Sequence, residues 1–153
     1  MVMLNDLFTP ANRLVVWLLR SPIGGPATRG LMVLEYEGRS SGRRYTIPVG
    51  HQRDGDSTIV LLSKPEAKNW WKNFREPWPA RLTFHKEQVD VCGVLVTPDD
   101  PEFFERVDAT LQRLPWMGSQ LGGFKYSRRA GLTEAQRAVV AEHAAVVRVD
   151  PVS

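Results

Sequence analysis

The sequence predicts one α+β domain built around a small antiparallel β-barrel of about six strands with peripheral helices. The 153 residues, 42% hydrophobic and 24% charged, suit a single globular domain. Most expected strands are joined by turns too short for parallel crossovers. Helical patterns lie towards the chain ends instead of alternating with strands. We therefore divide domain 1–153 into an N-terminal helical segment (1–30), the main barrel strands (31–96), and helices with a closing strand (97–153).

The first expected element is a helix over Asn12–Arg20, which the following Pro22 and nearby glycines terminate. Its apolar face is expected to pack on the core, and contact with a membrane surface is the alternative. The longest apolar run, Leu14–Leu19, is far shorter than the roughly 20 residues that cross a bilayer. The sequence therefore predicts no membrane span.

The next segments read as strands joined by turns. Leu31–Tyr36 and Tyr45–His51 flank a turn at Gly38–Arg44, and Pro48 predicts that the second strand is an edge or is bulged. After a hairpin turn at Asp54–Asp56, the apolar run Thr58–Leu62 has the pattern of a strand covered on both faces. We expect that run at the centre of the sheet.

The second half begins with a short helix expected at Lys68–Phe74. A hairpin follows, with arms Arg81–Lys86 and Gln88–Val96, whose apolar residues alternate. A helix is expected from the capping residues at Thr97–Pro101 to Leu114, and Trp116–Arg129 is expected to be irregular.

The last expected elements are a helix and a strand. Thr133 and Gln136 form a capping box for a helix ending near His143. Val146–Val149 then predicts the closing strand.

Composition excludes several classes of site. The single cysteine, Cys92, has no partner, and the chain opens without a signal-peptide pattern, which predicts a cytoplasmic protein. The three histidines are isolated, so no metal site is expected. The P-loop and GxGxxG motifs are absent. These exclusions favour chemistry carried by a bound cofactor.

Basic residues are concentrated between Arg39 and Arg81, where the sequence contains nine Lys or Arg and only four Asp or Glu. The turn Gly38-Arg39-Ser40-Ser41-Gly42-Arg43-Arg44 offers glycines for close approach, hydroxyls, and guanidiniums that bind phosphate or carboxylate. Ser63–Phe74 adds lysines, an amide and two tryptophans directly after a strand. The turn alone is equally typical of a solvent-facing hairpin, and a tryptophan pair is more often part of a core or interface. Together, however, the two stretches indicate a site for an anion joined to a flat ring.

These residues resemble the deazaflavin-dependent nitroreductase or quinone reductase family of the flavin/deazaflavin oxidoreductases. The resemblance runs from Leu18–Pro22 through Leu31–Pro48, with its Gly-Arg-x-Ser-Gly-Arg core, to Trp70–Phe74 and the following hairpin. It implies a split β-barrel of the FMN-binding type that binds coenzyme F420, with FMN as the related alternative. The implied reaction transfers hydride from the reduced coenzyme to a quinone, a nitro compound or another electron-poor small molecule.

Carried over by position, the resemblance implies coenzyme contacts from both stretches: Arg39, Ser41, Gly42, Arg43, Arg44, Pro48, Ser63, Lys64, Lys68, Trp70, Trp71 and Asn73. The acceptor is expected beneath Trp116–Arg129. Tyr126 and Tyr45 are the candidate catalytic residues, as proton donors to the reduced acceptor. The expected partner is a small-molecule acceptor rather than nucleic acid, the N-terminal helix could contact a membrane peripherally, and a homodimer is compatible with the sequence.

Two other functions are compatible with the same residues. A barrel of this kind could be a non-enzymatic carrier of a lipid or other apolar anion. Basic groups interleaved with tryptophan also suit single-stranded nucleic acid, which ranks third.

Overall fold

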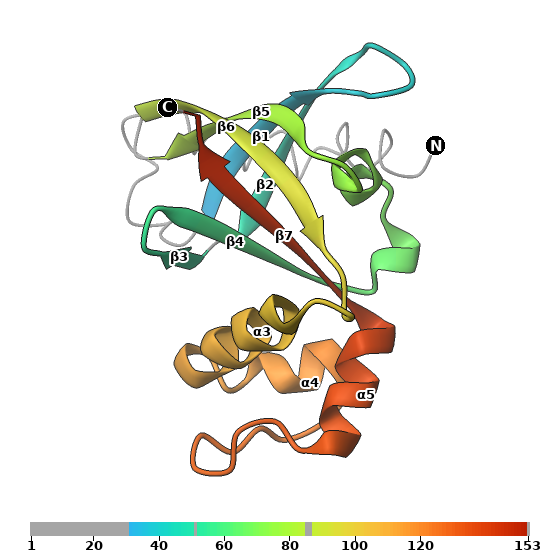
Figure 1. Ribbon diagram of the computed structural model, residues 1–153, viewed down its shortest axis with the longest axis vertical. Helices are drawn as coiled ribbons and strands as arrows, with labels where there is room; N and C mark the ends of the chain where they lie inside the picture. The colour runs from blue at the N-terminus through green and yellow to red at the C-terminus, as the bar shows by residue number, and fades with distance from the viewer. Residues whose placement is uncertain (1–30, 51, 85–86, 153) are drawn as a thin grey trace.

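The computed structural model describes residues 31–50, 52–84 and 87–152, so the helix expected at Asn12–Arg20 lies outside the described residues. Seven strands form one antiparallel sheet in the order β2-β1-β5-β6-β7-β4-β3 (Figure 1). The strands are β1 (Leu31–Glu37), β2 (Arg44–Gly50), β3 (Gln52–Asp54), β4 (Ser57–Ser63), β5 (Trp78–Phe84), β6 (Glu87–Val96) and β7 (Ala144–Pro151).

The sheet curls because its two edges are neighbours in the sequence. Strands β2 and β3 lie at opposite edges of the sheet, yet only residue 51 separates them in the chain. A flat sheet of this order could not bring its edges so close together, so the half-barrel follows from connectivity. Pro48 lies on edge strand β2, opposite Val33 of β1, which confirms the expected edge position.

The expectation that Thr58–Leu62 forms the centre of the sheet is wrong. This run belongs to β4, next to the short edge strand β3, and β6 is the central strand. The expected covering of both faces is nevertheless confirmed. Val60 and Leu62 pack inside the barrel, whereas Ile59 and Leu61 pack with the helices. A continuous apolar run therefore predicts that both faces of a strand are covered, but it does not predict the position of that strand in the sheet.

Within the described residues, three α-helices lie beside the sheet (Figure 1): α3 (Pro101–Arg113), α4 (Met117–Gly122) and α5 (Glu134–His143). The Asp100 carboxylate accepts from the Glu102 N–H at the start of α3, and both halves of the Thr133–Gln136 capping box are present at α5. Helix α4 lies in the segment expected to be irregular. Its Gly118 allows Phe124 to pack closely, because a Cβ there would lie 2.9 Å from the Phe124 carbonyl oxygen and 3.1 Å from its ring.

The sheet separates two hydrophobic cores. One fills the barrel and includes Tyr36, Tyr45, Trp70 and Phe74. The other joins the outer side of β4, β6 and β7 to the helices, with Phe103, Val107, Leu111 and Val140 fully buried. No helix within the described ranges has the length and apolar character needed to cross a membrane.

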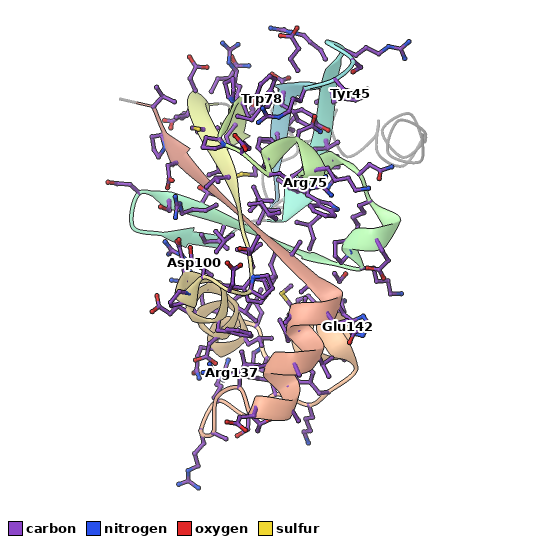
Figure 2. All side chains as sticks on the ribbon, turned by 45° about the vertical axis from the view of Figure 1, so that its right-hand side comes forward. Tyr45, Arg75, Trp78, Asp100, Arg137 and Glu142 are labelled. Carbon is purple, nitrogen blue, oxygen red and sulfur yellow. The ribbon has the colours of Figure 1, made fainter. Side chains whose placement is uncertain are left out.

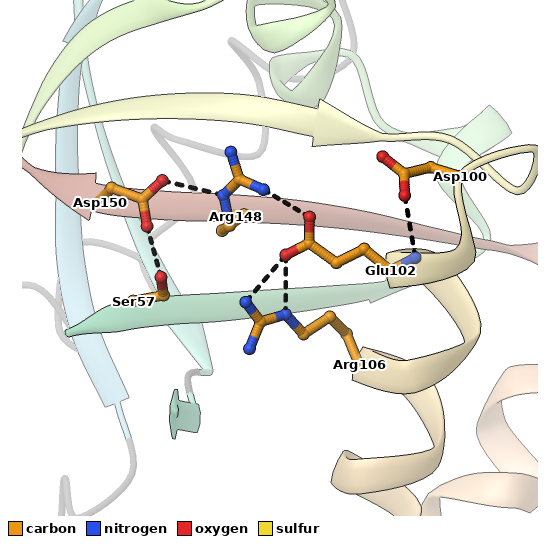
Figure 3. A network of polar contacts seen from close by, with 6 residues as sticks. All are labelled: Ser57, Asp100, Glu102, Arg106, Arg148 and Asp150. Atoms are coloured by element: carbon orange, nitrogen blue, oxygen red, sulfur yellow. Dashed lines mark hydrogen bonds and ion pairs between the residues drawn. The ribbon is translucent and has the colours of Figure 1, made fainter. Parts of the chain in front are cut away.

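A chain of ion pairs also joins the sheet to α3 (Figure 3). Arg148 of β7 contacts the carboxylates of Glu102 and Asp150, and Glu102 also binds Arg106 one turn along α3, at 2.8 Å. Ser57 of β4 donates to Asp150 at 2.5 Å. These side chains are partly buried, so this network fixes the helices against the barrel.

Candidate functional site

The turn between β1 and β2 is closed by its own backbone and by two glycines. The Gly38 N–H donates to the Arg43 carbonyl at 2.7 Å, and the Gly42 N–H donates to the Gly38 carbonyl at 2.9 Å. Gly42 has a φ of +70°, which favours glycine. A Cβ on Gly38 would lie 2.6 Å from the Ser41 hydroxyl oxygen. The two glycines are therefore required by the turn itself.

Arg39 joins this turn to the segment after β4. Its backbone N–H donates to Asn73 Oδ1 at 2.8 Å, and its Nε donates to the Asn73 carbonyl at 3.1 Å. A terminal guanidinium nitrogen donates to the Glu76 carbonyl at 3.0 Å, and the guanidinium lies 4.2 Å from the centre of the Trp78 ring. We call these contacts the Arg39 bridge. The two stretches singled out in the sequence thus come together.

The segment after β4 contains two short 3-10 helices, η1 (Pro65–Ala67) and η2 (Trp70–Phe74). Lys64 leaves the strand in the left-handed conformation, with φ 52°, and its N–H donates to the His143 carbonyl at 3.1 Å. The Lys68 ammonium donates to the Ser63 carbonyl at 2.6 Å. Lys68 therefore holds its own loop against the strand end, a role that sequence reasoning did not anticipate.

The two adjacent tryptophans have different environments. Trp70 is buried and packs edge-on against Phe74, so it belongs to the core. Trp71 is partly buried, and its indole N–H points to the carbonyls of Pro65 and Lys68 at 2.8 and 2.9 Å. The Lys72 ammonium and the Arg75 guanidinium lie 5.9 and 5.5 Å from the Trp71 ring centre. Two cations therefore lie beside the Trp71 ring. Arg75 was not predicted as a site residue, because it follows the stretch Ser63–Phe74 that the sequence analysis singled out.

Tyr45 connects the turn to the barrel core. Its ring stacks on Tyr36, with centroids 5.5 Å apart, and its hydroxyl lies 3.2 Å from the Ser41 hydroxyl. Burial, followed by the adjacent Tyr45 phenol, raises the pKa of Tyr36. Tyr36 therefore stays protonated through neutral pH. Nothing in the sequence singled it out, because an alternating strand aromatic is typical of any core.

A cleft of about 230 Å³ borders this hairpin on the sheet, and its charges are mixed. Only Arg44 and Tyr45 among the predicted site residues line it. The Arg44 and Arg81 side chains share it with three carboxylates, and Arg81 already pairs with Asp90 at 3.1 Å. The mixture does not favour an anionic ligand in this cleft.

The remaining predicted residues are spread along these elements. Ser63 ends β4 opposite Ala144, and Pro48 lies half-buried in β2. Arg43, Arg44 and Lys64 are exposed. Figure 2 shows Tyr45, Trp78 and Arg75 on the sheet half of the molecule, whereas Asp100, Arg137 and Glu142 lie on the helical half.

Tyr126 is the predicted residue that the structure separates from the others. It packs in the helical core, donates to Asp108 Oδ1 at 2.5 Å and accepts from the Gln112 amide at 2.7 Å. Burial, the hydrogen bond to Asp108 and the negative charge of Asp108 raise the pKa of Tyr126 to about 12. The two candidate tyrosines therefore belong to different cores.

Five cations of the turn and the 3-10 segment are free to meet a ligand. Among the described residues, no carboxylate lies within 4 Å of their charged atoms, and all five are exposed: Arg43, Arg44, Lys64, Lys72 and Arg75. Such groups bind phosphate and carboxylate through charge-assisted hydrogen bonds. The donor set fits a coenzyme with an anionic tail.

Solved structures support the fold. The heme storage protein HutZ from Vibrio cholerae superposes with a TM-score of 0.54 and 12% identity, over 90% of this chain and 88% of that one. A structure described as a domain-swapped dimer superposes with a TM-score of 0.51 and 12% identity, over 90% and 93%. One described as an F420 reductase has a TM-score of 0.43 and 14% identity, over 87% and 97%. The superpositions on HutZ and on the domain-swapped dimer show a shared fold, and the curled antiparallel sheet is the expected split β-barrel.

The sequence itself decides the family. No protein of curated function matches it significantly. A family profile described as F420H(2)-dependent quinone reductase matches residues 12–113, which is two thirds of the chain and contains both stretches of the candidate site. The chain therefore belongs to the F420H(2)-dependent quinone reductase family, whose members are oxidoreductases that use the deazaflavin coenzyme F420.

Proposed function

We propose that this chain reduces a quinone, a nitro compound or another electron-poor small molecule, and that its turn and 3-10 segment bind the anionic end of F420. The Arg39 bridge is the observation that carries the proposal, because it joins the two basic stretches into one surface. Family membership favours this reductase over a non-enzymatic carrier. Cytoplasmic location fits such an enzyme.

The cations have two different functions in this proposal. Arg39 and Lys68 bind backbone carbonyls and give the loops their shape. Lys72 and Arg75, which flank Trp71, are exposed and supply charge to the coenzyme tail. Because two hydrogen bonds fix the indole, Trp71 serves as a support for these cations.

When bound, F420 in its reduced form supplies the hydride. The chain's own part is to position the coenzyme, with Ser63 and the end of β4 beside its ring, and to bring the acceptor close. We assign proton donation to Tyr45, because it borders the cleft and contacts Ser41. The Tyr126 hydroxyl is already engaged by Asp108 in the other core.

The test is a fluorescence titration of oxidised F420 with the purified protein. The double variant K72Q/R75Q is expected to bind about tenfold more weakly at low salt, since hydrogen bonds to charged groups are lost. Added salt should reduce the difference in F420 affinity between this variant and the wild type. The control variant R128Q/R129Q removes the same charge from the helical half, and should bind F420 as the wild type does.

Steady-state reduction then identifies the acceptor class. With reduced F420 as donor, the wild type is compared on a soluble quinone and a nitroaromatic compound. We expect turnover of the quinone, and a lower rate in Tyr45→Phe at unchanged F420 affinity. Failure of the wild type to bind F420 contradicts the proposed site, whereas binding without turnover of either acceptor contradicts only the proposed acceptor class.

A further inference from the structure

A second basic surface lies at the helical end of the molecule, on the segment between α3 and α5. Residues 114–133 contain Lys125, Arg128 and Arg129 but no acidic residue. In Figure 1, the loop between α4 and α5 forms the end of the molecule farthest from the β1–β2 hairpin. We call Trp116, Lys125, Arg128 and Arg129 the helix-end surface.

Neutral contacts hold this loop in place. Arg128 Nε donates to the Gln112 carbonyl at 2.8 Å, and the Gln112 amide donates to the Arg128 carbonyl at 2.9 Å. The Phe124 N–H donates to the Gly118 carbonyl at 3.3 Å, so the chain before Lys125 is folded onto the start of α4. These contacts place Phe124 beside Gly118 and Arg128 beside Gln112, so the loop runs along the chain segment that contains Trp116.

Trp116 is unusual in its exposure. Its surface is 58% exposed, whereas Trp70, Trp71 and Trp78, the other tryptophans in the described ranges, are buried or half-buried. Its indole makes no hydrogen bond to any described residue. A large apolar ring in contact with water gains free energy when a partner covers it.

The three cations of the helix-end surface are available for binding. Across 31–50, 52–84 and 87–152, no carboxylate lies within 4 Å of the charged atoms of Lys125, Arg128 or Arg129. The nearby Asp108 carboxylate accepts from the Tyr126 hydroxyl. The surface therefore presents positive charge together with one exposed aromatic ring.

We propose that the helix-end surface docks on an anionic phospholipid bilayer, with Trp116 at the level of the headgroups. Lys and Arg near a membrane surface are attracted to anionic lipids, and tryptophan is enriched at the membrane–water boundary. Single-stranded nucleic acid is the less fitting partner, because its proteins stack successive bases on several aromatic rings. The proposal is independent of F420 binding.

The test is co-sedimentation of the full chain with large unilamellar vesicles. Wild-type protein is expected to bind vesicles of phosphatidylglycerol and phosphatidylcholine but not vesicles of phosphatidylcholine alone. Removal of each cation should weaken vesicle binding about fivefold, so R128Q/R129Q should bind about 25-fold more weakly than the wild type. Trp116→Ser should bind the vesicles about tenfold more weakly because the aromatic ring is lost, and Trp116→Phe should retain most of the affinity.

The control is K72Q/R75Q, which has the same net charge as R128Q/R129Q and should bind vesicles like the wild type. Circular dichroism checks that every variant is folded, and F420 titration provides a second check for R128Q/R129Q and the Trp116 variants. Equal losses in the two double variants would indicate attraction to net charge and overturn the proposal. So would unchanged binding in Trp116→Ser, absence of vesicle binding, or tight Trp116-dependent binding to an oligonucleotide instead of vesicles.

Discussion

At the hairpin end of the molecule, the side chains of Arg39 and Lys68 both hold loop backbone together, whereas in the loop after α4 only the side chain of Arg128 does so among the described basic residues. Arg39 donates to the carbonyls of Asn73 and Glu76, and Lys68 donates to that of Ser63. In the loop after α4, the Arg128 guanidinium donates to the Gln112 carbonyl, whereas the side chains of Lys125 and Arg129 have no charged partner among the described residues.

The comparison shows that the density of basic residues does not report how many are available to a ligand. A guanidinium whose donors already meet carbonyls contributes chiefly shape, since its hydrogen bonds are directional and its charge is shared with the loop. An exposed ammonium without a partner contributes chiefly long-range attraction, which salt screens. The two roles are therefore separable by experiment.

The largest effect is expected from Arg39→Ala. Loss of the Arg39 bridge should lower the free energy of unfolding by about 2 kcal/mol, and misplacement of the loops should reduce F420-dependent turnover about a hundredfold. Chemical denaturation and steady-state kinetics measure the two effects. The kinetic loss should persist at high salt, because it arises from geometry.

Two matched variants sharpen this result. Arg39→Lys keeps the charge but lacks the fork that reaches several carbonyls, so it should not restore turnover. Arg43→Ala removes an exposed cation of the same turn and should show a smaller loss that salt suppresses. Recovery of Arg39→Ala at high salt would mean that Arg39 acts as a charge and that the comparison is wrong.

Much of the fold could be predicted because local rules determine it. Pro48 placed β2 at an edge, Thr133 and Gln136 marked the start of α5, and the Asp54–Asp56 segment gave the β3–β4 hairpin, with Gly55 at φ 64°. The strand order could not be predicted in the same way. It depends on pairings between distant segments, such as β4 with β7.

A second prediction concerns the joint between the two halves of the molecule. Arg148→Ala leaves the Asp150 carboxylate, which is partly buried, without its guanidinium, and Glu102 with Arg106 alone (Figure 3). We expect the free energy of unfolding to fall by about 2 kcal/mol. Arg81→Ala breaks the exposed pair with Asp90 and should cost no more than about 0.5 kcal/mol. Equal losses in the two variants would contradict a structural role for the joint.

The third prediction tests the neutral contacts at the helical end. Tyr126→Phe should lower the free energy of unfolding by about 1 kcal/mol at neutral pH, because Asp108 loses its donor. Since the pKa of Tyr126 is raised from 10.0 to about 12 on folding, the wild type keeps this proton in the folded state after the unfolded chain has lost it. The extra stability of the wild type relative to Tyr126→Phe is therefore complete below pH 10 and declines as the pH rises towards 12.

Urea denaturation of both proteins from pH 7 to pH 12 measures that difference. The stability of the wild type relative to Tyr126→Phe should be constant up to about pH 9 and then fall. Tyr36 titrates in both proteins, so its contribution cancels. A difference that grows with alkaline pH would show that the Asp108 contact does not favour the protonated phenol.

The candidate site was recognisable from the sequence only in part. Arg39 and Lys68 were identified by residue type, but their contacts with backbone carbonyls depend on how the turn and η2 meet. Arg75 was missed, since nothing local indicates that it lies beside the Trp71 ring. Residue type predicts the chemistry available, whereas the partner that uses it is set by packing.

The smallest effect should distinguish two glycines with the same backbone conformation. Gly42 and Gly55 have φ values of 70° and 64°, and neither position would place a Cβ closer than 4.0 Å to another residue's heavy atoms. Gly42→Ala and Gly55→Ala should therefore each cost about 1 kcal/mol of stability, from the left-handed backbone alone. Only Gly42 lies in the turn held by the Arg39 bridge, so only Gly42→Ala should weaken F420 binding in the fluorescence titration. If both variants bind F420 as the wild type does, the turn backbone takes no part in holding the coenzyme, and the exposed cations alone account for the affinity.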